Sequence, residues 1–505
     1  MADHMTHPDD VRLSSGVPGV DNILRGGFPA KCLYLVSGEP GSGKTTFAMQ
    51  FLLEGIRHGD TCLYVTLSES KQEIAKVARS HGWDISKLII HELIPSEHNL
   101  SADQQLTVFN PSELELGATT EAMISAVERY KPTHVVIDSL SELRLVAQNP
   151  LRYRRQILAL KQFFSGRDCT VLMLDDCTAA VADGQVESIA HGVIVLEQLA
   201  NQYGAERRRL RVSKMRGVAF RGGFHDFMIR RGGLNVFPRL ISAEHHSDFP
   251  DKQLSSGNPG LDALLAGGLP FGTSTLLLGP AGTGKSTIAT QFAVTAANQG
   301  VRAAAFIFDE NLRTFRSRST KLGIPIEPHL AVGKISIQQV DPAELSPGEF
   351  VGIVRHAVDG SNSNEPAKVV IIDSLNGYLN AMPEEKFLTA QLHELLAYLG
   401  QQGVVTLLSV TQTGMVGSGN NSPVDTTYLA DNVILFRYFE SRGWVRRAIS
   451  VVKKRNGKHE STIRELHVTE KGIEVGEPLE NFHGVLTGVP TYVGDGLDLQ
   501  KKSRK

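Results

Sequence analysis

Two glycine-rich stretches of this sequence have the residue types and spacing that bind nucleotide phosphates. They read Gly38-Glu-Pro-Gly-Ser-Gly-Lys44-Thr45 and Gly279-Pro-Ala-Gly-Thr-Gly-Lys285-Ser286. In this pattern backbone N–H groups surround the phosphates of ATP or GTP, the lysine reaches the β- and γ-phosphates, and the hydroxyl (Thr45 or Ser286) binds Mg²⁺. Each loop lies between an apolar, strand-like run and a helical pattern, which is the context that the chemistry requires. The sequence therefore predicts two sites for ATP and Mg²⁺.

Each half of the chain also places an acid at the end of an apolar run. Asp138 and Asp373 end such runs, and we expect them to hold Mg²⁺, directly or through water, beside the phosphate loop. The alternative is an aspartate that merely ends a strand.

A further carboxylate is needed to orient or deprotonate the attacking hydroxyl. Glu69 and Glu310 end another strand-like run in each half and are the candidates, together with Asp309. Ser68 occupies the position that corresponds to Asp309 and cannot act as a base. An exposed acid at the start of a helix is the alternative, because it is favourable in its own right.

Two pairs of cations complete the chemistry that phosphoryl transfer needs. Lys214 and Arg216, and likewise Lys453 and Arg455, are two residues apart and so share one face of a strand. Such a face could reach the phosphates of a neighbouring subunit in a ring. A solvated strand face remains the alternative.

These residues must be positioned by a fold that the chain carries twice. Lys285 follows Lys44 by 241 positions, and the surrounding residues repeat at that same offset. Strand-like runs alternate with helical patterns, and residues 71–81 are one of the predicted helices. This alternation predicts an α/β fold with a mostly parallel sheet flanked by helices. Past Gly192 each half becomes rich in strands, which indicates a meander that closes the sheet.

The repeat divides the chain into an N-terminal extension (1–11), a first domain (12–240), a polar linker (241–254), a second domain (255–480) and a tail (481–505) that ends in basic residues. A net charge of −2 argues against general affinity for nucleic acid or anionic lipid. The N-terminus lacks a signal-peptide pattern, and no apolar run approaches the ~20 residues that span a bilayer, so we expect a cytoplasmic protein. Cys32, Cys62, Cys169 and Cys177 are expected to be buried free thiols.

With these residues in view, the sequence resembles the KaiC family of tandem RecA-like ATPases, which includes a circadian clock protein kinase. The resemblance runs from Arg12 to about Tyr492. It rests on Ser-Ser-Gly-x-Pro-Gly-x-Asp before each loop, on both loops, and on three further motifs, which are Ser80-His-Gly-Trp83-Asp, Lys214-Met-Arg216-Gly and Leu486-Thr-Gly-Val-Pro-Thr. It implies a homohexameric double ring that binds ATP between subunits. The first tier would hydrolyse ATP slowly, and the second would be a serine/threonine autokinase.

The resemblance also implies roles for individual residues. Nucleotide contacts would come from Gly41, Ser42, Gly43, Lys44, Thr45, Thr46, Ser80, Lys214 and Arg216 in the first tier, and from Gly282, Thr283, Gly284, Lys285, Ser286, Thr287, Arg447, Lys453 and Arg455 in the second. Where the family usually has paired glutamates, this chain has Ser68-Glu69 and Asp309-Glu310. Thr427 falls on the first phosphoacceptor position of the clock kinase and Tyr428 on the second, and Thr426 is a nearby alternative.

Two other classes of function remain open. A nucleic-acid motor should carry basic or aromatic loops in its channel, and the segments after Asp175 and after Gln412 carry neither, so binding of DNA or RNA is not expected. A signalling scaffold that assembles with ATP but turns it over weakly is consistent with Ser68 and Asp309. Further partners could be KaiB-like or other signalling proteins, in timekeeping or in stress responses.

Overall fold

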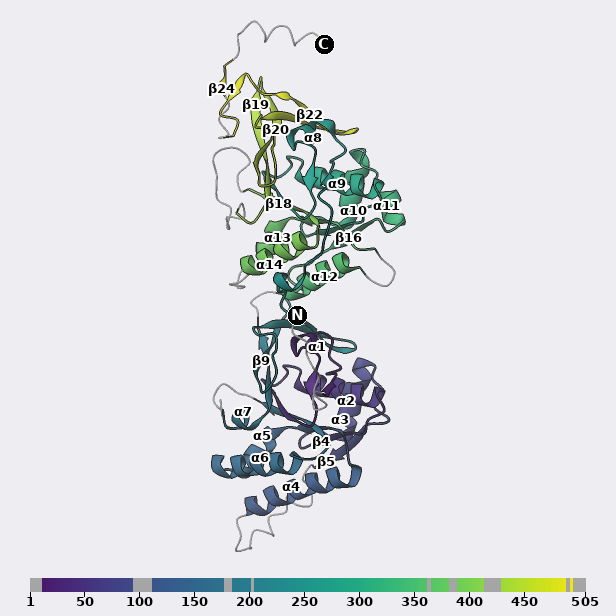
Figure 1. Cartoon of the computed structure of the whole chain (residues 1–505), viewed down its shortest axis with the longest axis vertical. Coiled ribbons are helices and arrows are strands. Elements are labelled where there is room, and N and C mark those ends of the chain that lie inside the picture. Colours follow the sequence, from purple (N-terminus) through teal and green to yellow (C-terminus); the bar gives the residue numbers. More distant parts are fainter. Residues whose placement is uncertain are drawn as a thin grey trace. The chain divides into compact units, whose positions relative to one another are not determined.

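The computed structural model describes residues 11–93, 111–176, 184–200, 204–360, 365–380, 388–412, 428–486 and 491–493. The chain forms two compact units, Met1–Arg239 and Leu240–Lys505 (Figure 1), and each is described here by itself. Each unit contains a nine-stranded, mostly parallel sheet with helices on both faces, so the predicted α/β class is confirmed.

The sheet of the first unit has the strand order β11-β10-β9-β8-β3-β7-β6-β4-β5. The strands from β8 to β5 in this order run parallel, whereas β9, β10 and β11 join antiparallel as the predicted meander. The bounds are β3 (Leu33–Gly38), β4 (Cys62–Thr66), β5 (Ile89–Glu92), β6 (His134–Asp138), β7 (Thr170–Asp176), β8 (Gly192–Leu199), β9 (Arg207–Met215), β10 (His225–Arg230) and β11 (Gly233–Phe237).

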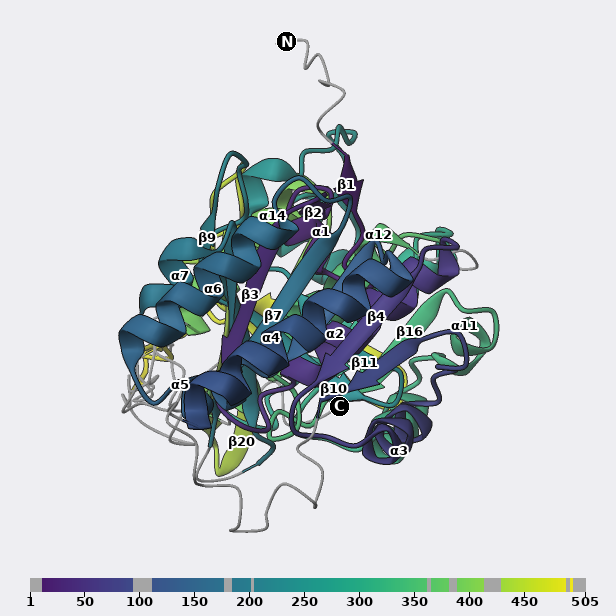
Figure 2. The same ribbon diagram turned by 90° about the horizontal axis from the view of Figure 1, so that it is seen from below.

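Helices cover this sheet on both faces because alternate strand residues point to opposite sides. Tyr34 and Val36 pack with α2 (Lys44–Arg57) and α3 (Lys71–His81). Leu35 and Ile137 pack with α4 (Pro111–Tyr130), α5 (Leu140–Ala147) and α6 (Pro150–Phe164). Figure 2 shows α4 and α6 lying across the strands. The predicted helix 71–81 is confirmed as α3, which begins with a capping box at Ser70 and ends at Gly82.

The second unit repeats this architecture, in the strand order β16-β15-β17-β18-β14-β19-β20-β21-β22. Its sheet strands are β14 (Ser274–Gly279), β15 (Ala303–Ile307), β16 (Ile335–Gln339), β17 (Val369–Asp373), β18 (Val405–Thr411), β19 (Asn432–Ser441), β20 (Trp444–Lys454), β21 (Arg464–Thr469) and β22 (Gly472–Pro478). Its helices are α8 (Pro259–Leu264), α9 (Lys285–Asn298), α10 (Leu312–Lys321), α11 (Glu327–Ala331), α12 (Pro347–Asp359), α13 (Leu375–Asn380) and α14 (Leu388–Gln401).

Smaller elements complete both units. They are α1 (Val20–Ile23), α7 (Gly184–Ile189) and the two-residue strands β1 (Arg12–Leu13), β2 (Phe28–Pro29), β12 (Gln253–Leu254), β13 (Leu269–Pro270), β23 (Phe482–His483) and β24 (Thr491–Tyr492).

The segment between the two repeats is bound along the second unit. Leu240 is buried in that unit's core, and the short 3-10 helix Ser242–Glu244 follows it. The backbone N–H of Ser242 donates to Glu394 at 3.1 Å, and the Ser247 hydroxyl donates to Gln402 at 2.9 Å. The domain bounds stated from the sequence stay a prediction, but this polar segment is held by α14 and the residue that follows it.

No helix within the described ranges is both long enough and apolar enough to cross a membrane. Cys62 and Cys169 are buried free thiols and Cys32 is a half-buried one, whereas Cys177 lies outside the described residues.

A buried histidine makes the first unit sensitive to acid. His225 is 1% exposed, its Nδ1 accepts from the Arg239 N–H, and its Nε2 faces the Arg221 carbonyl at 3.0 Å, a pattern that fits neutral imidazole. Burial lowers the pKa of His225 to about 4, against ~6.5 in an unfolded chain. The unfolded state therefore binds the proton first, and about 3 kcal/mol of stability should be lost as the pH falls from ~6.5 to ~4.

Urea titrations followed by Trp83 fluorescence, in a Trp444→Phe background, would measure this loss. His225→Asn should flatten the pH dependence, whereas His58→Asn on the surface should not change it. A wild-type first unit that is equally stable at both pH values would contradict the prediction.

Candidate nucleotide-binding sites

The first phosphate loop is positioned by a buried strand and a helix. All residues of β3 are buried, and α2 begins directly at Lys44. Gly43 has a φ of 104°, and a Cβ there would lie 2.7 Å from Ile229 Cδ1, so this turn requires glycine. The resulting helix N-terminus directs backbone N–H groups at the place where phosphate would bind.

Lys44 and Thr45 lie beside the ends of two other strands of the same sheet. The Lys44 ammonium donates to the carbonyls of Gly38 and Glu39 at 3.0 and 2.9 Å and pairs with Asp176 at 2.6 Å. The Thr45 hydroxyl donates to Asp138 at 2.9 Å. The structure thus brings Lys44, Thr45 and Asp138 together, as a loop that binds nucleotide phosphates and Mg²⁺ requires.

Asp138 is buried, and two hydroxyls donate to its carboxylate. They come from Thr45 and from Tyr64, which lies on the neighbouring strand β4. Burial raises the pKa of Asp138, and these two hydrogen bonds oppose that shift. A hydroxyl and a carboxylate oxygen side by side are ligand types that suit Mg²⁺, so Thr45 and Asp138 fit the ion that accompanies ATP.

Glu69 follows β4 and lies near Asp138. Its Oε2 atom is buried and has no hydrogen-bond partner among the residues that the structure describes. Burial raises the pKa of Glu69, and the charges of Asp138 and Glu73 raise it further. A carboxylate with a raised pKa and one buried oxygen left without a partner is suited to accept a proton.

The second phosphate loop has a different surrounding. The Lys285 ammonium donates to the carbonyls of Gly279 and Pro280 at 2.8 and 2.7 Å. Burial lowers the pKa of Lys285 to about 8, although the charge of Asp373 opposes the shift. Asp373 is itself buried and accepts a hydrogen bond from Ser409.

The two acids that follow β15 in the second unit both contact other side chains. Asp309 accepts from the Ser374 hydroxyl, and Glu310 pairs with Arg318 of α10 at 2.9 Å. Arg318 also approaches the hydroxyl of Thr287, in the phosphate-binding stretch, at 3.4 Å. At the same offset the first unit has Val77, so Glu69 lacks this cation.

The cations Lys214 and Arg216 lie level with the amino-terminal end of β3, whereas their own phosphate loop follows its carboxyl end. Both donate to the carbonyl of Ser188, although β9 ends at Met215 and Arg216 follows it, so the shared strand face stays a prediction. Met215, between them, is in register with Gly192 and through it with Tyr34. Strand spacings place this point about 16 Å from Gly38, where the phosphate loop begins.

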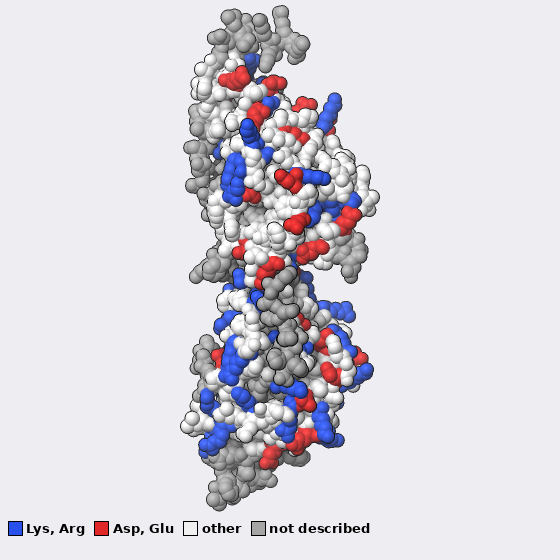
Figure 3. Space-filling view, viewed as in Figure 1, with Lys and Arg blue, Asp and Glu red and all other residues white. Residues whose placement is uncertain are grey.

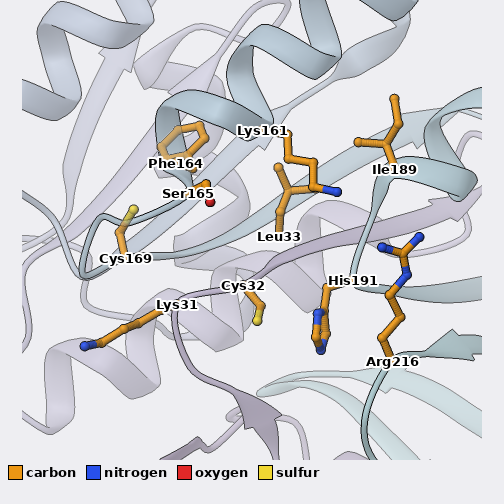
Figure 4. A pocket seen from close by; sticks show the side chains of 10 residues that line it. All are labelled: Lys31, Cys32, Leu33, Lys161, Phe164, Ser165, Cys169, Ile189, His191 and Arg216. Carbon is orange, nitrogen blue, oxygen red and sulfur yellow. The ribbon is translucent and has the colours of Figure 1, made fainter. Parts of the chain in front are cut away.

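A cavity of about 180 Å³ opens beside Arg216 (Figure 4). Basic side chains of Lys161, from α6, and of Lys31 and Arg216 line it, and none of its described lining residues is an acid. Burial lowers the pKa of the adjoining His191, and the charges of Arg216, Lys214 and Lys161 lower it further. Lys31 is paired with Asp168 at 2.7 Å, so Lys161 and Arg216 are the cations of this lining that could attract an anion.

The corresponding cations of the second unit occupy the same strand register but contact other groups. Lys453 donates to the Ala430 carbonyl at 2.7 Å, and Arg455 pairs with Asp431 at 3.0 Å. Arg447 instead donates to the Gly282 carbonyl at 3.2 Å and so touches the phosphate loop of its own unit.

The remaining site predictions are only partly described by the structure. Ser80 is exposed on α3 and donates to the carbonyl of Val77 at 2.7 Å. Thr426 and Thr427 lie outside the described residues, whereas the adjoining Tyr428 is 57% exposed.

Sequence reasoning missed the hydroxyls of Tyr64, Ser374 and Ser409. It also missed the charged residues Asp176 and Arg318. An acidic end of β7, which adjoins β3, was the available signal for Asp176. For Arg318 the sequence offered no signal beyond its helical spacing from Glu310.

Comparisons with known proteins identify the family to which both units are similar. Residues 13–241 and 254–480 each match a family model described as a KaiC ATPase. The circadian clock oscillator protein KaiC of Thermostichus vulcanus is 29% identical over 489 residues, 95% of this chain and 92% of that protein. The circadian clock protein KaiC3 of Synechocystis sp. is 27% identical over 493 residues, 95% of each. The circadian clock oscillator protein KaiC of Synechococcus elongatus is 28% identical over 494 residues, which are 96% of this chain and 93% of that protein.

Proposed function

Because this chain belongs to the KaiC family of ATPases, we propose that it is a KaiC-like ATPase and serine/threonine autokinase that hydrolyses ATP in its first unit and phosphorylates itself near Thr426 and Thr427 in its second. The observation that carries the proposal is the contrast between two phosphate-loop sites on one chain. One has an unpaired Glu69, and the other has Glu310 paired with Arg318.

This contrast supports a division of labour between the units. Glu69 can accept the proton of an attacking water because its Oε2 atom has no hydrogen-bond partner in the part of the chain that the structure describes. Glu310 is held by Arg318, and Asp309 by Ser374, so water activation is disfavoured in the second unit until these contacts change. Mg²⁺, held by Thr45 and Asp138 or by Ser286 and Asp373, would neutralise charge on the phosphates.

The place of Lys214 and Arg216 supports catalysis between subunits. These cations lie near the end of β3 that is remote from their own loop, and Arg216 lines a cavity there, so a neighbour's phosphates are the fitting target. We propose a homohexamer with ATP at its interfaces. Its further partners would be KaiB-like or other signalling proteins, and it would act as a clock or signalling hexamer, in keeping with the names of its relatives.

Two other functions have less support. The hypothesis of a signalling scaffold with weak turnover is favoured because Asp309 and Glu310 are both bound to other side chains, those of Ser374 and Arg318. The nucleic-acid motor is not favoured, because both basic and acidic side chains lie on the visible face of each unit in Figure 3.

Incubation of the full-length protein with ATP and Mg²⁺, followed by mass spectrometry, tests the autokinase. Phosphate should appear on the peptide that contains Thr426 and Thr427. The Lys285→Ala variant should incorporate at least ~100-fold less, because it lacks the cation that reaches the β- and γ-phosphates. Turnover of ATP without any phosphopeptide would favour the ATPase alone, and binding without turnover would favour the scaffold.

A further inference from the structure

The ammonium of Lys44 is held by a carboxylate that has no counterpart in the second unit. Asp176 contacts it at 2.6 Å and also accepts from the Ser141 hydroxyl at 2.9 Å. The Lys44 side chain is 8% exposed and that of Asp176 is 33% exposed, so the pair is partly shielded from water. Burial raises the pKa of Asp176, but the hydrogen bond and charge of Lys44 lower it more, so the carboxylate stays ionised.

Strand register identifies the matching residue of the second unit. Gly38, at the end of β3, pairs with Asp176, and Gly279, at the end of β14, pairs with Thr411. Thr411 carries no charge, and Lys285 donates to the backbone carbonyls of its own loop. The two sites therefore differ by one negative charge next to the phosphate-loop lysine.

We propose that Asp176 is a specificity-determining residue of the first site, whose carboxylate stands on Lys44 in the place of the γ-phosphate and so lowers the preference for ATP over ADP. The inference rests on the proposed function, since it requires the first loop to bind these nucleotides. The lysine of such a loop reaches both the β- and the γ-phosphate. A carboxylate on the same ammonium competes with the γ-phosphate but leaves the β-phosphate contact available.

This competition acts differently on the two nucleotides. ADP has no γ-phosphate, so Lys44 can bind the β-phosphate of ADP and retain its ion pair with Asp176. ATP brings a negative group to the ammonium that Asp176 already holds, and two close like charges repel. The loss of the γ-phosphate would let the pair re-form, which favours retention of ADP after hydrolysis.

The test measures selectivity in the full-length protein with the second loop disabled by Lys285→Ala. Dissociation constants for ADP and for a non-hydrolysable ATP analogue, both with Mg²⁺, would be obtained by calorimetry. Asp176→Thr, which installs the residue of the second unit, should raise the ratio of the ADP constant to the analogue constant about fivefold, the scale of one partly solvated charge pair. Asp176→Asn should act alike. Glu128→Gln, an exposed acid on α4, should leave the ratio unchanged.

The reciprocal change guards against a loss of folding in the first unit. Thr411→Asp, in a Lys44→Ala background, should lower the same ratio at the second loop. Equal effects on both nucleotides, or a weaker affinity for the analogue in Asp176→Thr, would overturn the inference. A parent chain whose first loop binds neither nucleotide would contradict the proposed function instead.

Discussion

Replacement of Glu69 by glutamine should lower ATP turnover in the first unit by about 100- to 1,000-fold, the range expected when a general base is removed. The reason is the buried, unpaired Oε2 atom and the raised pKa of its carboxyl group. Glutamine keeps the shape of the side chain but cannot accept a proton. Nucleotide affinity should change little, because Lys44 and the loop amides are untouched.

The pH profile gives a second readout of the same role. A base must be deprotonated, and the pKa of Glu69 is raised, so activity should decline on acidification at a higher pH than an ordinary glutamate would cause. Glu69→Gln should remove this limb of the profile. Glu128→Gln, which removes an exposed acid on α4, serves as control and should leave this limb in place.

Comparison of the two units makes this prediction sharper. Glu310→Gln should reduce total ATP turnover much less, because Arg318 already neutralises that carboxylate. If Glu310→Gln proved the more damaging change, hydrolysis would belong to the second unit and the proposed division would be wrong.

Replacement of Arg216 by alanine should reduce turnover in the first unit by about 1,000-fold, the lower end of what a cation supplied from a neighbouring subunit contributes. Arg216 follows β9 level with the amino-terminal end of β3, remote from Gly38, so we expect it to act on another subunit. Arg208→Ala, on β9 but paired with Glu206, should have little effect. Steady-state ATPase assays in a Lys285→Ala background would measure both.

Mixed assemblies decide whether the contact crosses subunits. Arg216→Ala subunits keep an intact phosphate loop, and Lys44→Ala subunits keep the cation. Coassembled from unfolded or monomeric chains, the two inactive variants should recover part of the wild-type rate at their shared interfaces. Failure to recover any activity, in assemblies shown to contain both chains, would place Arg216 in the site of its own subunit.

Local sequence was sufficient wherever a site depends on residues close together in the chain. The two phosphate loops, the helix 71–81 and the strand that ends at Asp138 could each be predicted because turn chemistry and periodicity are local properties. The duplication also determined that two such sites exist, since the same motifs return at one offset. From the sequence alone, the chain is therefore a tandem of two α/β nucleotide-binding units.

Tertiary structure decided how each site is tuned. Asp176 meets Lys44, and Arg318 meets Glu310, through strand order and helix packing, which no local pattern encodes. A crossover sheet gathers the carboxyl ends of strands that are distant in sequence, so equal motifs acquire unequal neighbours. One loop thus has a carboxylate on its lysine and an unpaired glutamate, and the other has neither.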